Sequence, residues 1–251
     1  MPIRLRLQNR WRFKDEKTSD FYAYGTARPF CFGSGYASAD SAIADNQPIL
    51  VTAFEPFGGE KLNPTEQVLG TLPDAIGGYS IHKLLLPVEF VKARERVMAE
   101  YDRISPAAVI MLGQAGGRSA ITPETTAVNM MIGAEDGFLS PDNAGYAPDH
   151  LPIVKGGPES LQSTLPIDRI IEAVKAAGIP CEGSDDAGRY VCNTVFYSML
   201  EHDKGAVPTG FIHVPYIKEQ GHEDEPYLEL DDISRGIAVA IETVASTLGN
   251  E

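Results

Sequence analysis

PILVTAFEPFGGEKLNPTEQVLGTL, residues 48–72, sets a pattern that the rest of the chain repeats. Its first seven residues are a short apolar run between a proline and a Pro/Gly-rich loop, which is typical of a buried β-strand. A helix is predicted to follow, because Asn63 suits the N-cap, Pro64 the first helical position and Glu66 the third position after the cap. The stretch therefore predicts a strand, a loop and a helix in succession.

The same alternation continues downstream. Strand-like runs cover residues 79–90, 107–113 and 210–216, and helical patterns cover 91–104, 165–178, 191–202 and 230–249. Between them, residues 119–165 form a long irregular excursion with one β-like run, TTAVNMMI. Alternating strands and helices are typical of α/β proteins with a largely parallel sheet. We expect residues 48–251 to form a single-domain, three-layer α/β/α sandwich around a mostly parallel, mixed sheet.

Composition excludes several classes of protein. The formal net charge of −14 argues against nucleic-acid binding, which relies on clustered Lys and Arg. No apolar run reaches the roughly 18 residues that span a bilayer, and the N-terminus lacks the apolar core of a secretory signal. Three cysteines, Cys31, Cys181 and Cys192, are too few for a disulfide framework and suit a reducing compartment. We expect a cytoplasmic protein without nucleic-acid or membrane partners.

Residues 1–47 differ from the remainder of the chain. They contain the only tryptophan and seven Lys or Arg against five Asp or Glu, so this segment carries about +2. No period of 2 or 3.6 is present, and its Gly/Ser/Ala-rich end is typical of a linker. A transit peptide, a partner-binding arm and a wrongly assigned start codon all fit, and we favour the last. We expect this N-terminal extension to be disordered or spurious.

Cys192 is the first candidate for chemistry. It lies in YVCNTVFYSMLEH (190–202), at the start of a predicted helix. A cysteine in an apolar segment is usually a core residue. However, the unpaired N–H groups and positive end of a helix dipole lower a thiol pKa and could hold a developing oxyanion. The position therefore favours a nucleophilic thiol with a lowered pKa.

A nucleophilic thiol requires a base, and GFIHVPY (210–216) provides His213 near the carboxyl end of a predicted strand. Functional sites of α/β sheets gather at such ends. An imidazole in turn needs an acceptor that orients it. Four carboxylates could serve, and the residues alone do not choose among them: Glu124, Asp142, Asp185 and Asp186.

Two loops could line a ligand site. GQAGGR (113–118) lacks the spacing of a dinucleotide or phosphate loop, so it is a weak nucleotide signal, but it can bring backbone groups close to a small ligand. AFEPFGGEKLNP (53–64) places Phe54 and Phe57 on a Pro/Gly-rich loop after the first strand. Phenylalanine in a loop either packs beneath it or lines a pocket.

Five stretches carry a resemblance to a known family. They are VTAFEPFGGEKLNP, GQAGGRSAITPE, STLPI, YVCNTVFY and GFIHVPYIKEQ. In their order and approximate spacing, the sequence resembles the pyroglutamyl-peptidase I family of cysteine peptidases over about residues 48–249. The resemblance implies an exopeptidase that removes N-terminal pyroglutamyl residues from peptides, without metal or cofactor. Relatives often form tetramers, so a homotetramer is one expected assembly.

The resemblance also implies roles for individual residues. Cys192 is similar to the family's nucleophile, His213 to its general base and Glu124 to the acid that orients the imidazole. The pyroglutamyl pocket is implied to comprise Phe54, Phe57, Asn63, Gln114, Tyr190 and Val191.

Three features depart from the family pattern. The loop at 129–141 is about five residues longer and lacks an arginine that lies near the pocket in relatives. Thr125 replaces the arginine that usually follows the acid, and residues 1–47 have no counterpart. The missing arginine favours one alternative, a catalytically weakened homologue that binds capped N-termini, whereas the intact Cys192, His213 and Glu124 argue against it. A nucleoside phosphorylase-like enzyme rests on the glycine loop and the α/β pattern alone.

Overall fold

The three central strands are apolar runs whose residues are all buried. They are β1 (Ile49–Phe54), β4 (Ala108–Gln114) and β8 (Thr209–Val214). The computed structural model describes residues 47–133, 141–222 and 224–248. Continuous burial indicates that both faces of the sheet are covered, as in other parallel sheets, and it explains why these strands read as unbroken apolar runs.

The main sheet has six strands, in the order β2-β3-β1-β4-β8-β5. β1 pairs in parallel with β3 (Tyr79–Leu86) and β4, and β4 pairs in parallel with β8. The edge strands β2 (Ala75–Ile76) and β5 (Thr122–Glu124) are antiparallel to their neighbours. The sheet is therefore mixed and mostly parallel, and β1, β4 and β8 have their carboxyl ends on the same side of it, at the carboxyl-terminal edge.

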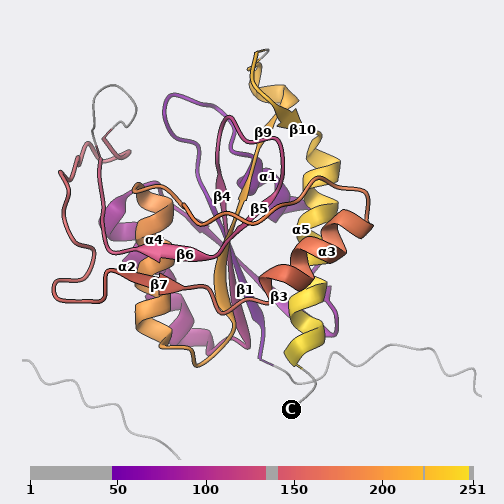
Figure 1. The fold of residues 1–251 in the computed structure, drawn as a ribbon, viewed down its shortest axis with the longest axis horizontal. Coiled ribbons are helices and arrows are strands. Elements are labelled where there is room, and N and C mark those ends of the chain that lie inside the picture. The colour runs from indigo at the N-terminus through magenta and orange to yellow at the C-terminus, as the bar shows by residue number, and fades with distance from the viewer. Residues whose placement is uncertain (1–46, 134–140, 223, 249–251) are drawn as a thin grey trace, which may run out of the picture. The chain divides into compact units, whose positions relative to one another are not determined.

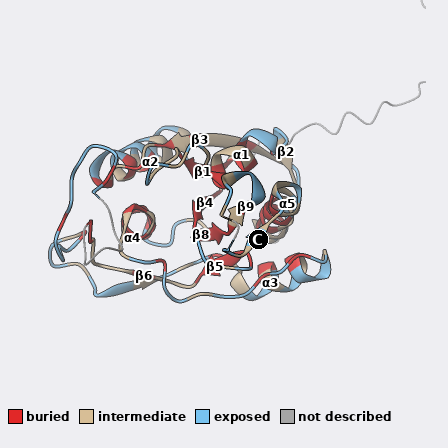
Figure 2. Ribbon diagram, turned by 90° about the horizontal axis from the view of Figure 1, so that it is seen from above, coloured by how far each residue is buried: buried red, intermediate tan, exposed pale blue. Residues whose placement is uncertain are grey.

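Helices cover both faces of the sheet (Figure 1). α1 (Pro64–Thr71), α3 (Ile167–Ala176) and α5 (Leu230–Leu248) share one apolar core with the sheet. α2 (Phe90–Ile104) and α4 (Val191–Asp203) share a second core on the opposite face. Buried residues accordingly lie on the sheet and on the helix faces turned toward it (Figure 2). The predicted α/β/α sandwich with a mostly parallel, mixed sheet is confirmed.

Two small sheets lie outside the main one. β6 (Thr126–Val128) pairs with β7 (Ser160–Gln162), and β9 (Tyr216–Ile217) pairs with β10 (Tyr227–Leu228). The 3-10 turn η1 (Lys218–Gln220) follows β9. Among the described residues, no helix is both long and apolar enough to cross a membrane.

Two of the differences from the predicted elements are informative. The strand predicted over 79–90 ends at Leu86, and α2 begins at Phe90, whose N–H donates to the Asp142 carboxylate at 3.0 Å. That contact spans 52 residues, so local sequence could not reveal it. The second difference is β5, which lies in a segment expected to be irregular. Residues 1–46 of the predicted N-terminal extension (1–47) and residues 134–140 of the longer loop lie outside the described residues.

Candidate active site

His213 and Glu124 lie on the same face of neighbouring strands. β5 pairs antiparallel with β8, with Thr122 opposite His213 and Glu124 opposite Phe211. Residues two apart on a strand share a face, so Glu124 and His213 are diagonal neighbours. Glu124 Oε1 lies 2.7 Å from His213 Nδ1, and both side chains are buried. Because a carboxylate only accepts, Nδ1 carries the proton and Nε2 is left as an acceptor.

Cys192 is the second residue of α4, whose N-cap is Tyr190. The helix packs against β8, and glycine at position 113 leaves room for the sulfur. A Cβ added to Gly113 would lie 3.0 Å from Cys192 Sγ and 2.7 Å from the Phe211 ring. Gly113 is also the direct partner of His213 in the parallel ladder. The thiol and the imidazole therefore approach the same point, and both line one cavity.

The thiol does not have the lowered pKa that its helix position predicts. Although part of the residue is exposed, burial of the sulfur raises the pKa of Cys192 to about 12, and the negative charge of Glu124 acts in the same direction. A backbone hydrogen bond and the positive charge of Arg118 lower this pKa, but they are outweighed. The expectation of a lowered thiol pKa is therefore wrong for the free protein, because desolvation exceeds the effect of the helix start.

His213 and Glu124 respond to burial in different ways. Burial lowers the pKa of His213 below its ordinary 6.5, although the hydrogen bond and charge of Glu124 raise it. Burial alone would raise the pKa of Glu124, but hydrogen bonding to His213, with smaller contributions from Ser184 and Arg118, brings it below 4.5. Oε2 itself has no hydrogen-bond partner among the described residues. At neutral pH the site thus contains a neutral thiol, a neutral imidazole and an ionised carboxylate.

The other carboxylates considered for the histidine have different surroundings. Asp142 is buried and accepts backbone N–H groups at the start of α2 and in its own turn, those of Phe90, Ala144 and Tyr146. Asp186 is exposed and pairs with Arg189 at 2.7 Å, and Asp185 is also exposed. Glu124 is therefore the carboxylate that the fold brings against His213.

A narrow cavity adjoins the thiol. The expected pocket residues all line it, together with one valine and the cysteine: Phe54, Phe57, Asn63, Val88, Gln114, Tyr190, Val191 and Cys192. Two of its three aromatic rings, those of Phe57 and Tyr190, have centroids 6.3 Å apart. Phe57, Gln114, Tyr190 and Cys192 also line a wider cavity of about 660 Å³ that contains His213. The two cavities thus share these four lining residues.

Asn63 has the capping role predicted from the sequence. Its Oδ1 accepts from the N–H of Thr65 at 3.0 Å and from the Thr65 hydroxyl at 2.8 Å, while Nδ2 donates to the Glu55 carbonyl at 3.1 Å. The residue is fully buried and also lines the narrow cavity. Its amide therefore fixes the loop that carries Phe57, and only one of its N–H groups is left for a ligand.

Several residues at the site were not singled out from the sequence. Gln220 Nε2 donates to Gln114 Oε1 at 2.9 Å, so the amide of Gln114 presents its NH₂ group as the remaining polar end. Arg118 ends the GQAGGR loop, which the sequence analysis treated as a backbone feature, yet its Nη1 lies 2.6 Å from Glu124 Oε1. Asn193, next to the thiol, bonds to β6 through its side chain. The only available signal was their place inside the matched motifs.

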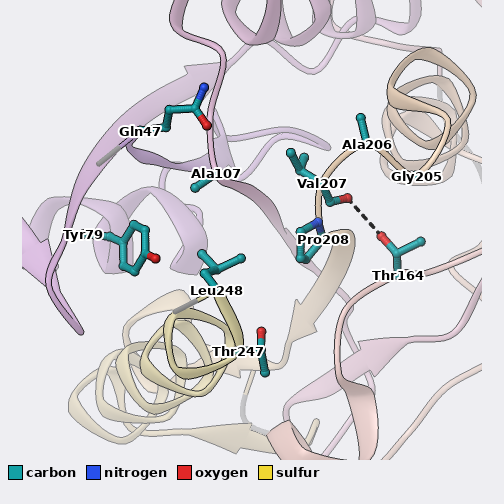
Figure 3. A pocket seen from close by; sticks show the side chains of 10 residues that line it. All are labelled: Gln47, Tyr79, Ala107, Thr164, Gly205, Ala206, Val207, Pro208, Thr247 and Leu248. Atoms are coloured by element: carbon teal, nitrogen blue, oxygen red, sulfur yellow. Dashed lines mark hydrogen bonds between the residues drawn. The ribbon is translucent and has the colours of Figure 1, made fainter. Parts of the chain in front are cut away.

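A second cavity, of about 510 Å³, lies at the opposite edge of the sheet (Figure 3). Its lining residues include Ala107 and Pro208, which directly precede β4 and β8, and Gln47, which lies two residues before β1. Its ten labelled residues include no Cys, His, Asp or Glu, and the hydrogen bond drawn joins Thr164 to the Val207 carbonyl at 3.3 Å. It therefore lacks the acid–base groups of the first cavity.

Comparison with known proteins identifies the family of the chain. The family model for pyroglutamyl peptidase matches residues 47–247. The chain belongs to the pyroglutamyl peptidase family. It is therefore a hydrolase of the cysteine peptidase class.

The relatives and solved structures align with about four fifths of this chain. A pyrrolidone-carboxylate peptidase of Lactobacillus helveticus is 42% identical over 201 residues, which are 78% of this chain and 98% of the relative. The pyroglutamyl peptidase I of Bacillus amyloliquefaciens superimposes with a TM-score of 0.75 at 38% identity, over 80% of this chain and 95% of that one. A pyrrolidone carboxyl peptidase of Pyrococcus furiosus gives 0.74 at 41% identity, over 80% and 99%.

Proposed function

We propose that this peptidase hydrolyses the bond after an N-terminal pyroglutamyl residue, with Cys192 as nucleophile, His213 as general base and Glu124 as the group that orients the imidazole. The observation that carries the proposal is the buried 2.7 Å contact between His213 Nδ1 and Glu124 Oε1, beside a cavity that Cys192 also lines. A nucleophile, a base and an orienting acceptor in this relation are what covalent acyl transfer requires.

The reaction would start from an uncharged thiol and imidazole. As Cys192 Sγ attacks the scissile carbonyl carbon, its proton passes to His213 Nε2, and the ionised Glu124 stabilises the imidazolium that forms. The imidazolium then protonates the departing amine as the C–N bond breaks, which leaves a thioester on Cys192. His213 next removes a proton from water, which attacks the thioester and regenerates the thiol while free pyroglutamate leaves.

Oxyanion stabilisation is assigned to the start of α4. The N–H groups of the first helical turn have no partners within the helix, and Cys192 is the second helical residue. These donors and the positive end of the helix dipole suit the negative oxygen of a tetrahedral intermediate. The helix position of the cysteine would thus act on the transition state, while burial keeps the resting thiol neutral.

The walls of the narrow cavity suit a flat, uncharged lactam, and its volume of about 10 Å³ means that they must move apart to admit one. Phe57 and Tyr190 offer aromatic faces, and the NH₂ group of Gln114 can donate to a carbonyl oxygen. Pyroglutamate has a ring N–H and a ring carbonyl, whereas proline lacks the carbonyl. A site that pairs with that carbonyl would reject proline, because its donor would remain buried and unpaired.

The test is release of a fluorogenic amine from its pyroglutamyl amide, measured with the unaltered chain and with Cys192→Ala. We expect steady release by the former, none by the latter, and none by either from the corresponding prolyl amide. Turnover that survives Cys192→Ala would rule out the nucleophile assignment. Absence of turnover by the unaltered, folded chain would rule out the proposed activity.

A further inference from the structure

Arg118 contacts the carboxylate of Glu124 from the side of the glycine loop. Its Nη1 donates to Glu124 Oε1 at 2.6 Å, and this is the same oxygen that accepts from His213 Nδ1 at 2.7 Å. Nη1 also donates to the Thr122 hydroxyl. The Glu124 side chain is completely buried. Among the described residues, it forms ion pairs with the Arg118 guanidinium and with His213. One carboxylate oxygen is therefore shared between a permanent cation and the imidazole.

The other arm of the guanidinium reaches a different segment. Nη2 donates to the backbone carbonyl of Asp186 at 2.8 Å, in the loop that leads into the Cys192 helix. Arg118 thus joins the glycine loop after β4, the acid on β5 and the approach to the nucleophile. A planar, forked donor can hold two acceptors in fixed directions, which a lysine cannot do.

We propose that Arg118 is a positioning residue for catalysis: it fixes the rotamer of Glu124, and through Glu124 it aligns His213 with Cys192. This inference rests on the proposed function of the three residues. Arg118 acts on the imidazole through the carboxylate, so it is not assigned any contact with the reacting atoms.

A purely structural role for Arg118 accounts less well for the contacts. Arg189 already ties the same loop together, through Asp186 Oδ1 at 2.7 Å and the Gly188 carbonyl at 2.7 Å, and the Asp186 carboxylate accepts the Gly188 N–H at 3.0 Å. Arg189 has no recorded contact with Glu124. Of the two arginines, Arg118 is the one that contacts the Glu124 carboxylate, so Arg189 provides a matched control on the same segment.

The charge of Arg118 acts on the whole site. It lowers the pKa of Glu124, of His213 and of the Cys192 thiol. The other charges that act on His213 are Glu124, which raises its pKa most strongly, and Asp186, which also raises it. Removing Arg118 should therefore raise the pKa of Glu124 and of His213. A protonated Glu124 no longer stabilises an imidazolium, and a protonated His213 is not a base.

The experiment compares Arg118→Ala, Arg118→Gln, Arg118→Lys and Arg189→Ala in the full chain, with release of a fluorogenic amine as the assay. We expect the Ala and Gln variants to lose about 10- to 100-fold in kcat, as is typical when the outer partner of an active-site ligand is removed, with KM changed less than about threefold. The acidic limb of kcat/KM should move to higher pH. Arg118→Lys should keep the acidic limb in place and recover part of kcat, and Arg189→Ala should remain within about twofold of the unaltered chain.

A second arm tests whether Arg118 works through Glu124. In a Glu124→Gln background, adding Arg118→Ala should cost less than about threefold in kcat, because coupled residues are not additive. Thermal unfolding of every variant identifies those that fail to fold, and the Gln and Lys variants decide the question if Ala does not fold. The proposal is overturned if kcat and the acidic limb are unchanged in the folded Ala and Gln variants, or if the loss is equally large without Glu124. Activity of the unaltered chain separates these outcomes from failure of the proposed function.

Discussion

His213 and Cys192 are both neutral in the resting site, because each is buried. Burial lowers the pKa of the imidazole and raises the pKa of the thiol to about 12, and both shifts disfavour a preformed thiolate–imidazolium pair. In the proposed reaction, the charge separation develops during attack, where Glu124 and the start of α4 can stabilise it. At the scale of single residues, the site is arranged for the transition state and not for a charged ground state.

The pH dependence follows from the lowered pKa of His213. The base must be neutral, so kcat/KM should be full above that pKa and should fall as the pH decreases through it. We expect the acidic limb to have its midpoint below pH 6.5, in a pH–rate profile over a range where unfolding is excluded by circular dichroism. A midpoint clearly above 6.5 would contradict a neutral, desolvated imidazole.

Gly113 provides a steric test of the same geometry. A methyl group at this position would lie 2.7 Å from the Phe211 ring and 3.0 Å from Cys192 Sγ, so Gly113→Ala must displace one of them. We expect a destabilisation of about 1–3 kcal/mol from overpacking and a kcat loss of up to roughly 100-fold from misplacement of the thiol.

The control for that test is Gly70→Ala in α1, where an added Cβ meets nothing within 4 Å. This substitution should leave kcat unchanged and should not destabilise the protein, since alanine favours the helix. Urea denaturation and steady-state kinetics of both variants would check the pair. An active Gly113→Ala variant with kcat near that of the unaltered chain would show that the sulfur is not held against β4.

At the scale of elements, the start of α4 is fixed by a side chain next to Cys192, the proposed nucleophile. Asn193 is fully buried, and its amide accepts from the Val128 N–H at 2.9 Å and donates to the carbonyls of Val128 and Met130 at 2.8 and 2.9 Å. Two of these bonds join the first turn of α4 to Val128 of β6, and the third reaches Met130, two residues after that strand. The helix that carries the thiol is thus held in register by its neighbour in sequence.

Asn193→Ala should therefore affect both stability and catalysis. Loss of the amide leaves partly buried backbone groups of β6 without partners, which costs about 1–3 kcal/mol, and movement of the helix start should lower kcat. Asn129→Ala is the matched control, because Asn129 makes comparable amide bonds to Val154, in the loop before β7. It should destabilise the protein while leaving kcat nearly unchanged, as measured by denaturation and steady-state kinetics. Equal kcat losses in the two variants would contradict a specific role for Asn193.

The sequence predicts some elements and not others, for physical reasons. β1, β4 and β8 are long apolar runs, so their type is recognisable without tertiary information. β5 has three residues, one of them Pro123, and no periodicity can be detected over that length. Glu124 therefore appeared as a loop carboxylate among four candidates, although the strand pairing of β5 with β8 is what brings it to His213.

At the scale of the whole molecule, strand order decides which residues meet. The order β4-β8-β5 places the glycine loop, His213 and Glu124 side by side, and the crossover through α4 brings Cys192 over them. The sequence indicates the alternation of strands and helices, but neither this order nor the pairing of Arg118 with Glu124 follows from local pattern. The family resemblance identified Cys192, His213 and Glu124, whereas Arg118, Asn193 and Gln220 needed the folded chain.

The two cavities, at the carboxyl and the amino ends of the parallel strands, differ in the groups that line them. The edge at the carboxyl ends of the parallel strands contains the thiol, the imidazole and the ionised carboxylate, and the opposite edge contains a cavity without such groups. This is the arrangement expected of open α/β sheets, where ligands bind beyond the carboxyl ends of the strands. The central claim concerns a covalent intermediate at that edge.

The most direct measurement is mass spectrometry of the protein quenched in acid within one turnover of a pyroglutamyl amide. The account predicts an increase in mass by one pyroglutamyl group, located by proteolysis on the peptide that contains Cys192 and absent from Cys192→Ala. Turnover of the substrate with no adduct on Cys192, or an adduct on another residue, would contradict it.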